Sequence, residues 1–530
     1  MKRFFVILAL AFLLTNNINA SDFSAVCESG QTLYYNITSN LEPFTVEITS
    51  ENATEPYYTA QYHSTSDTIP YYSTYPVGVL TIPSFVTYNN INYSVTNIGS
   101  HAFYGCNGLT SITIPNTITS IGDYAFYGCH GLTLVSIPNS ITNISHSAFS
   151  CCARLISLIM PNSVTNIGDC AFSGCSDLIS VYYTGNLAQW CEISFGGHNA
   201  NPLNSAHNLY IGDTLVTDLI IPSTIPEVKD FAFDGAECIT SVDVSASRIG
   251  SNAFRNCSNM TSATIGNSVT SIGGGAFFQC SIMESLNFNA TNCTSMEEPF
   301  LYCPALTTII IGNNVTNIPY SAFCGCNITS VTIPSSVTNI GDYAFKNCRR
   351  LTTINFNATN CNSMERSVWN ECSSLSTLNI GDNVTRVPDN AFYNCSGLAG
   401  TLFLPNSITS IGSYAFYNCN GLTGTLSIPN FITSIGDFAF YGCAGLVGID
   451  FNAINCTTMG SLWCPVFQSC TSLSTINIAE NVINIPDYAF YKCTGISSII
   501  LPSSVSSIGK CAFKDCSSLN TVYFNATNCT

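Results

Sequence analysis

Apolar and polar positions along this chain follow a pattern that returns about every 23 residues. In one copy, Leu109, Ile112 and Ile114 are the apolar positions of a predicted β-strand and are expected to point inward. Thr113 lies between them and is expected to point to solvent. Pro115 ends the predicted strand, because proline has no backbone donor for a continuing ladder.

The second half of the copy carries a second apolar group. Ile118 and Ile121 are expected to face the same core as the strand. Gly122 then permits a turn, and Ala125 and Phe126 close the copy. The two halves together account for the buried positions of one repeat.

The phenylalanine position recurs in 17 copies, with Val368 taking the position between Phe345 and Phe392. The copy around Phe300 departs from the consensus in composition, although its spacing is kept. Such a period is typical of a solenoid, in which stacking on neighbours completes the core of each copy. The other positions are Phe103, Phe126, Phe149, Phe172, Phe233, Phe254, Phe277, Phe323, Phe416, Phe440, Phe467, Phe490 and Phe513.

The first residues have the order of a secretory signal peptide. Lys2 and Arg3 precede an apolar run, and Ala20 offers a small residue for cleavage. We therefore predict a signal peptide at residues 1–20 and export of the protein. No later stretch has the length of uninterrupted apolar sequence that a membrane span needs, so we predict no transmembrane segment.

The remaining chain divides by whether it carries the repeat. Residues 21–78 do not, and their alternating stretches at 33–37 and 44–49 predict two short strands of an N-terminal β cap or linker. The repeats are predicted at 79–181 and again at 222–530. The last run ends on a string that is elsewhere followed by another copy, so we expect truncation inside a repeat.

Residues 182–221 interrupt the rhythm. We predict an irregular insertion with a loop and a hairpin that turns at Gly212 and Asp213. An insertion in a solenoid maps to one face, often a binding face, so Trp190 and His198 become candidate ligand contacts. The alternative is an inert insertion, because surface loops lengthen at little cost in free energy.

The copy at residues 109–129, LTSITIPNTITSIGDYAFYGC, resembles the BspA-like, or Treponema-type, class of leucine-rich repeat. The resemblance covers most of residues 79–530. It implies a repeat solenoid that is mainly β, with short turns or 3-10 segments and a parallel sheet on the concave face. It also implies an exported surface protein of bacteria or protists, for which adhesion to host matrix proteins or other cells is the commonest proposed role.

The charge of the chain excludes one class of partner. With 14 basic and 31 acidic residues, the formal net charge is −17. Nucleic-acid binding needs clustered Lys and Arg to neutralise phosphates, so no nucleic-acid partner is predicted. Serine, threonine, asparagine and glycine keep the surface polar instead.

Of the 28 cysteines, 16 recur at one repeat position, three residues after the phenylalanine in regular copies. A position filled once per turn forms an internal ladder of small apolar side chains. Parallel rungs do not suit the disulfide torsion, so cysteines outside the ladder are the better disulfide candidates. The ladder includes Cys106, Cys129, Cys152, Cys175, Cys257 and Cys280, and the disulfide candidates include Cys27, Cys151, Cys170, Cys191, Cys238, Cys324, Cys464 and Cys511.

No pattern of catalytic residues is present in the sequence. It has no GxSxG elbow, HExxH helix, phosphate-cradling loop or dinucleotide fingerprint, and no paired CxxC of a zinc site. The GlyAsp turns at Asp123, Asp169, Asp342 and Asp437 could bind calcium or be solvated turn residues, and no other oxygen ligands can be identified. We predict a protein that is not an enzyme and that has no cofactor or metal.

The outward strand face is the main candidate for ligand contact. Concave repeat surfaces bind extended partners through many small contacts, and tyrosine supplies a large area with a polar tip. The alternative is that these residues are polar only because they lie on an exposed strand face, and that they bind no ligand. The candidates are Thr110, Thr113, Thr329 and Thr332 on the strands and Tyr127 and Tyr417 on the adjoining turn.

We therefore predict a secreted or cell-surface, non-enzymatic protein that binds an extracellular protein or glycan. The predicted role of this binding is adhesion. The alternative function is a structural spacer or coat component that displays a missing C-terminal module.

Overall fold

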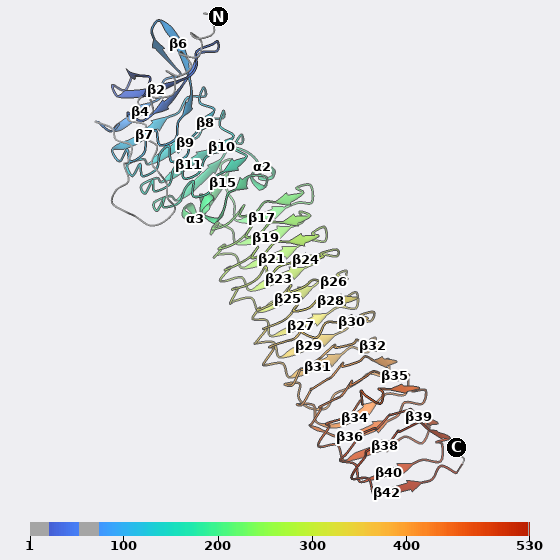
Figure 1. The fold of residues 1–530 in the computed structure, drawn as a ribbon. Helices are drawn as coiled ribbons and strands as arrows, with labels where there is room; N and C mark the ends of the chain where they lie inside the picture. The colour runs from blue at the N-terminus through green and yellow to red at the C-terminus, as the bar shows by residue number, and fades with distance from the viewer. Residues whose placement is uncertain (1–20, 52–73, 528, 530) are drawn as a thin grey trace, which may run out of the picture. The chain divides into compact units, whose positions relative to one another are not determined.

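The structure is a computed structural model that describes residues 21–51, 74–527 and 529 (Figure 1). These residues form two compact units. Unit 1 contains the described residues up to Thr217 together with Val228–Ile239, and unit 2 contains Asp218–Glu227 and the residues from Thr240 on. Each is a parallel β-solenoid with almost no helix, as predicted. The predicted signal peptide at residues 1–20 lies outside the described residues.

Each regular turn contributes one long strand to a parallel sheet. The strand is built by the LTSITI stretch that the sequence pattern indicated, and successive strands pair in register, for example Ser157 with Ser180. In unit 1 these strands are β4 (Gly78–Thr81), β7 (Leu109–Thr113), β9 (Leu134–Ser136), β11 (Ser157–Met160), β13 (Ser180–Tyr183) and β15 (Asn208–Ile211).

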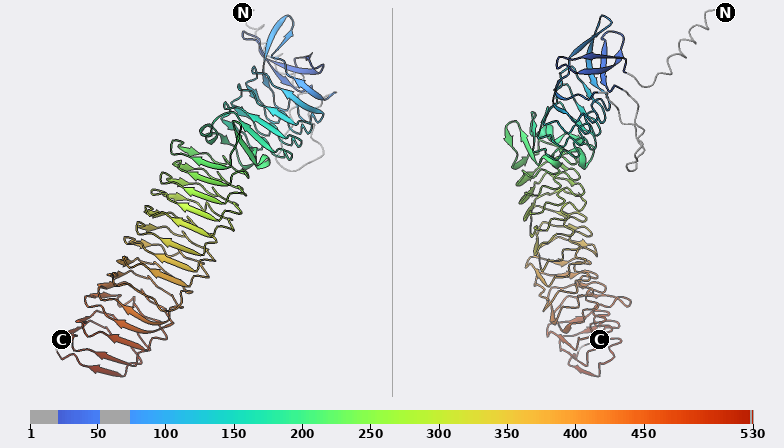
Figure 2. Two further views of the ribbon diagram at one scale, coloured as in Figure 1. Left: turned by 180° about the vertical axis from the view of Figure 1, so that it is seen from behind. Right: turned by 90° about the vertical axis from the view of Figure 1, so that its left-hand side faces the viewer.

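The long strands of unit 2 follow one another from turn to turn (Figure 2, left), except in the turn around residues 400–405, which forms only an isolated bridge at Gly400. They are interrupted into several hydrogen-bonded groups. The strands are β17 (Asp218–Ile221), β19 (Ser241–Val244), β21 (Ser262–Ile265), β23 (Ser285–Phe288), β25 (Thr308–Ile311), β27 (Ser330–Ile333), β29 (Thr353–Phe356), β31 (Thr377–Ile380), β34 (Gly424–Ile428), β36 (Leu446–Phe451), β38 (Thr475–Ile478), β40 (Ser498–Leu501) and β42 (Thr521–Phe524).

A second ladder of two-residue strands runs along the other side of the core, and the sequence pattern did not predict it as a sheet. Two residues are too short to show alternation. In unit 1 the strands are β8 (Ser120–Ile121), β10 (Asn143–Ile144), β12 (Asn166–Ile167) and β14 (Ser194–Phe195). The others are β18 (Glu227–Val228), β20 (Arg248–Ile249), β22 (Ser271–Ile272), β24 (Ser295–Met296), β26 (Asn317–Ile318), β28 (Asn339–Ile340), β30 (Ser363–Met364), β32 (Arg386–Val387), β33 (Ser410–Ile411), β35 (Ser434–Ile435), β37 (Thr458–Met459), β39 (Asn484–Ile485) and β41 (Ser507–Ile508).

The core of a turn lies between these two ladders. Leu109, Ile112 and Ile114 are buried and Thr113 is exposed, which confirms the predicted strand faces. Gly122 has a different role from the predicted one, because it does not adopt a left-handed backbone. A Cβ at Gly122 would lie 2.5 Å from the backbone nitrogen of Ser100, so glycine is needed for the close approach of two turns.

Phenylalanine rings stack along the core, one per turn. In unit 1 the ring centroids of neighbouring turns lie 5.0 to 5.6 Å apart. The assignment of Val368 to this row was wrong, because Trp369 stacks on Phe345 at 4.7 Å. The backbone N–H of Phe345 donates to Val368, just as that of Phe103 donates to Ala125. Val368 therefore occupies the alanine position.

The ladder cysteines named above are fully buried, as predicted. They are more than filler, since most thiols donate a hydrogen bond to the phenylalanine carbonyl of the preceding turn. The Sγ of Cys129 lies 3.1 Å from the oxygen of Phe103, and that of Cys280 lies 3.2 Å from the oxygen of Phe254. All described cysteines are free, the disulfide candidates included. Cys151, for example, has glycines at the equivalent positions of both neighbouring turns.

The N-terminal segment adds strands to the short-strand ladder of unit 1. The two predicted strands are present as β2 (Thr32–Ser39) and β3 (Thr45–Thr49), which pair antiparallel. β3 then pairs parallel with β6 (Ile91–Ile98), and β6 pairs with β8. β1 (Phe23–Val26) and β5 (Phe85–Tyr88) complete this sheet.

Residues 182–221 are an enlarged part of the solenoid. They hold the helices α2 (Leu187–Cys191) and α3 (Leu203–Ala206) and the 3-10 turn η1 (His198–Ala200). Strand β15 turns at Gly212 and Asp213 into β16 (Thr214–Leu215), with which it forms an antiparallel hairpin. Among the described residues, no helix is long and apolar enough to cross a bilayer.

Candidate binding surfaces

The sheet face of unit 1 carries a groove that we call the sheet groove. Its volume is about 480 Å³, and it crosses the ends of β7, β9 and β11. Thr113, one of the predicted contacts, lines it together with Ser111, Ser136, Asn116 and Asn139. The lining contains no charged side chain. This groove can offer hydroxyl and amide groups to a neutral polar ligand.

The other predicted threonines are also exposed, but they lie outside the lining of this groove. Thr110 and Thr329 each accept, through the backbone oxygen, a hydrogen bond from a threonine hydroxyl one turn further on. The Oγ1 of Thr332 accepts from the amide of Asn355 at 3.2 Å. Part of the polar character of this face is therefore used to join neighbouring turns.

The predicted tyrosines belong to outer aromatic stacks on the turn side. Tyr127 stacks on Tyr104 at 4.9 Å, and Tyr417 lies between Tyr393 at 5.0 Å and Tyr441 at 4.8 Å. Desolvation, and then the neighbouring tyrosines, raise the pKa of Tyr417. Since their faces cover one another, these rings present mainly edges and hydroxyl groups to a partner.

Trp190 is not a ligand contact. It lies at the end of α2, its exposed fraction is 0 %, and its ring packs edge-on against Tyr183 at 5.2 Å. Its Nε1–H donates to the carbonyl of Ala232 at 2.9 Å, which satisfies the polar atom of a buried indole. The prediction was wrong because the insertion is folded into the core of unit 1 and does not form a loose surface loop.

His198 serves mainly to hold the insertion in place. Its ring is 36 % exposed, and its Nδ1 donates to Oδ2 of Asp234 at 2.6 Å. The Asp234 side chain is fully buried. Asn201 donates to the carbonyls of Phe231 and Ala232 in the same segment. These bonds tie the loop after β14 to residues 228–239 within unit 1.

The substitution His198→Ala is expected to lower the free energy of unfolding by about 1–3 kcal/mol, because it removes a hydrogen bond from a buried carboxylate. Urea unfolding followed by circular dichroism measures this loss. His130→Ala is the matched control, since His130 is exposed. Equal midpoints for the two variants would show that the pair with Asp234 contributes nothing.

Two aspartates of the GlyAsp turns, Asp123 and Asp342, have a structural role, because their side chains accept hydrogen bonds from the backbone of the next turn. The Oδ1 of Asp123 accepts from the backbone N–H of His146 in the next turn at 3.0 Å, and that of Asp342 accepts from Ser367 at 3.2 Å. Among the described residues, no three His, Cys, Asp or Glu side chains gather as metal ligands.

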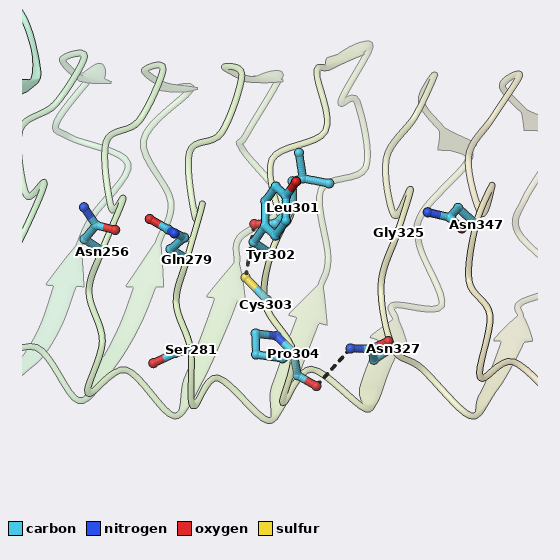
Figure 3. A pocket seen from close by; sticks show the side chains of 10 residues that line it. All are labelled: Asn256, Gln279, Ser281, Leu301, Tyr302, Cys303, Pro304, Gly325, Asn327 and Asn347. Carbon is cyan, nitrogen blue, oxygen red and sulfur yellow. Dashed lines mark hydrogen bonds between the residues drawn. The ribbon is translucent and has the colours of Figure 1, made fainter.

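A second groove, which we call the turn groove, lies on the turn side of unit 2 and was not predicted. Its volume is about 680 Å³, and it spans the turns from Asn256 to Asn347 (Figure 3). Its polar lining is made of asparagine, glutamine and serine, and Tyr302 contributes a ring that is 66 % exposed. The signal in the sequence was the departure from consensus after Phe300, which brings in Tyr302 and Pro304.

A family model described as the BspA-type leucine-rich repeat region matches residues 84–202, 206–326, 296–423 and 399–520. A leucine-rich repeat protein from Bacteroides ovatus is 25 % identical over 84 % of this chain and 92 % of its own, with a TM-score of 0.43. A leucine-rich cell surface protein from Faecalibacterium prausnitzii is 23 % identical over 95 % of both chains, with a TM-score of 0.26. The pneumococcal vaccine antigen PcpA is 16 % identical over 79 % of this chain and 94 % of its own, with a TM-score of 0.34.

The chain matches none of the curated proteins. The matches to the repeat model extend over far more than half of the sequence and follow the same repeats that the solenoid turns display. The chain therefore belongs to the BspA-type leucine-rich repeat family.

Proposed function

We propose that this protein is exported to the cell surface or beyond and adheres, through the faces of its solenoid, to an extracellular protein or glycan without catalysing a reaction. The family consists of leucine-rich repeat proteins that are generally non-enzymatic binding scaffolds.

The observation that carries this proposal is the chemistry of the two grooves. The sheet groove and the turn groove are lined by hydroxyl, amide and apolar groups, and neither lining includes an aspartate, glutamate, histidine, lysine or arginine. General acid–base catalysis most often uses such a group within hydrogen-bond reach of the substrate. A neutral lining suits recognition, in which hydrogen bonds fix orientation and apolar contacts supply affinity.

The test is binding of the purified chain to an array of extracellular-matrix proteins, mucins and glycans. Thr113→Arg places a bulky charge in the sheet groove. It is expected to lower the affinity for a captured partner about tenfold, equivalent to about 1.4 kcal/mol. Thr332→Arg is the matched control, because Thr332 holds the equivalent strand position in unit 2, away from that groove. Residues 182–221 are unsuitable for a deletion, since they include the buried Trp190.

Saturable binding that Thr113→Arg weakens and Thr332→Arg does not would support adhesion and place it on the sheet groove. Equal weakening by both variants would argue for a wider sheet face. A well-folded chain that binds nothing on the array would overturn the proposal and favour the structural spacer.

A further inference from the structure

The turn groove has the features of a separate ligand site. It lies along one row of residues, one per turn, each of which precedes the ladder cysteine. In Figure 3, Asn256, Gln279, Tyr302, Gly325 and Asn347 follow one another along this row. All five have a left-handed backbone, with φ between 56° and 73°, and all five line the groove. The groove therefore presents a regular series of groups from five successive turns.

The amides at one end of this row are available to a ligand. In the part of the chain that the structure describes, the side-chain amides of Asn256 and Gln279 make no hydrogen bond within the protein. Further along, the Oδ1 of Asn347 accepts from Arg349 at 2.7 Å, and the amide of Asn327 donates to the carbonyl of Pro304 at 3.1 Å. Asparagine and glutamine each offer a donor and an acceptor side by side. Two such groups can bind neighbouring hydroxyls of one ligand.

The ring of Tyr302 stands in the middle of the row and is open to solvent. It packs against the ring of Phe278 in a T-shaped arrangement with the centroids 5.2 Å apart, while 66 % of the residue stays exposed. The next residue of the row is Gly325, which has no side chain to cover the ring (Figure 3). A flat group can therefore enter beside Tyr302 over Gly325.

We infer that the turn groove binds a neutral, extended oligosaccharide. A sugar ring has an apolar C–H face for Tyr302 and equatorial hydroxyls for the amides of Asn256 and Gln279. Turns of a parallel solenoid repeat about every 4.8 Å, comparable with the advance of one hexose along an extended chain, so successive sugars meet successive turns. The lining carries no charged side chain that would select an ionised ligand. This inference rests on the proposed binding function and names the ligand class of one site.

The experiment titrates the full chain with cellotetraose and chitotetraose by calorimetry and by saturation-transfer NMR, with tetragalacturonic acid as the charged comparison. Binding of a neutral tetrasaccharide is expected, with saturation transferred from an aromatic ring. Tyr302→Ala should weaken it about tenfold, the equivalent of about 1.4 kcal/mol. Tyr320→Ala should leave it unchanged, because Tyr320 is also a largely exposed tyrosine of unit 2 but lies outside the groove.

A second variant fills the groove without disturbing the fold. Gly325→Asn places an amide where the row elsewhere has Asn256 and Asn347, and asparagine tolerates this left-handed backbone. The new Cβ would approach no atom closer than 3.4 Å. The variant is expected to melt like the parent and to lose tetrasaccharide binding.

The inference is overturned if neither neutral tetrasaccharide binds, if the charged one binds better, or if Tyr302→Ala and Gly325→Asn bind as the parent does. A proline-rich peptide is titrated alongside, and tighter binding of this peptide than of either neutral tetrasaccharide would also overturn the inference, in favour of a polypeptide ligand. Each of these results leaves the array outcome with Thr113→Arg standing, because that test concerns the sheet groove. An array without any captured partner, by contrast, removes the proposed adhesion even where a tetrasaccharide binds.

Discussion

Raising the pH above about 9 is expected to unfold unit 2 in one steep transition, because its buried thiols cannot ionise while the solenoid is folded. Burial raises the pKa of Cys419, Cys443 and Cys470 above the ordinary value of 9.0, for Cys470 to about 12. An unfolded chain releases these protons near pH 9, whereas the folded chain keeps them. The thiol contribution to stability is therefore complete below pH 9 and is lost as the pH rises toward the folded pKa.

The effect is large because the thiols act together. Each one lowers the free energy of unfolding by about 1.4 kcal/mol per pH unit above the unfolded pKa. Burial is the main cause of the shifts, except at Cys280 and Cys348, where the hydrogen bond to the next ladder thiol, Cys303 or Cys372, comes first. The ladder thiols of unit 2 with a raised pKa are Cys280, Cys326, Cys348, Cys395, Cys419, Cys443, Cys470, Cys493 and Cys516.

Eight of these groups are deeply buried and imply a loss on the order of 10 kcal/mol per pH unit, comparable with the whole stability of an ordinary domain. Cys516 is less deeply buried and adds less, because solvent screens its thiolate. Urea unfolding at a series of pH values, followed by circular dichroism, measures the slope. A tyrosine with the ordinary pKa of about 10 is mostly protonated at about pH 9 and half ionised only at about pH 10, so the slope just above pH 9 reports mainly the thiols.

Cys419→Ala is the matched variant, because it removes one titrating thiol together with its hydrogen bond to the carbonyl of Phe392. The variant is expected to be less stable at neutral pH and to show a slope that is shallower by one proton. A stability that stays constant between about pH 8 and 10 would contradict the prediction.

The sequence was sufficient to predict the solenoid because each turn repeats the same buried positions. Leu109, Ile112 and Ile114 are buried as their pattern indicated, and the cysteines named from spacing form the inner ladder. Two details could not be read from one copy. The two-residue strands are too short to show alternation. That Trp369, and not Val368, belongs to the row of stacked rings became visible only through the backbone partner of Phe345 and the ring contact between Phe345 and Trp369.

The residues of the insertion were misread for a different reason. A lone tryptophan between polar residues looks like a surface anchor, but Trp190 packs against a segment that follows it by some 40 residues, since its hydrogen-bond partner is Ala232. His198 likewise depends on Asp234. A hint was present at Ala236, which stands where a regular copy has its ladder cysteine, and so marks this turn as irregular.

The turn groove was within reach of the sequence, but only with the register of the turns in hand. Tyr302 looks like a drifted consensus position in the linear sequence. Once every residue before a ladder cysteine is known to share one outward row, the order Asn256, Gln279, Tyr302, Gly325 and Asn347 describes a surface. Departures from a repeat consensus at exposed positions are therefore more informative about binding than the consensus itself.

Phe416→Ala is expected to lower the free energy of unfolding of unit 2 by about 3–5 kcal/mol, the usual cost of removing a buried aromatic ring. The Phe416 ring is fully buried and stacks on Phe392 at 5.4 Å and on Phe440 at 5.1 Å. Stability in a solenoid is close to a sum of turns and of the interfaces between neighbouring turns. One truncation in the middle of the stack therefore weakens two interfaces at once.

The same change near the end of the stack is the matched control. Within the described part of the chain, Phe513 stacks on Phe490 alone, at 5.5 Å, and is partly exposed. Phe513→Ala is therefore expected to cost clearly less than Phe416→Ala in urea unfolding of the full chain. If the two substitutions cost the same, the stability of unit 2 does not depend on the coupling of neighbouring turns through their rings, and the thiol ladder and the two strand ladders must provide that coupling.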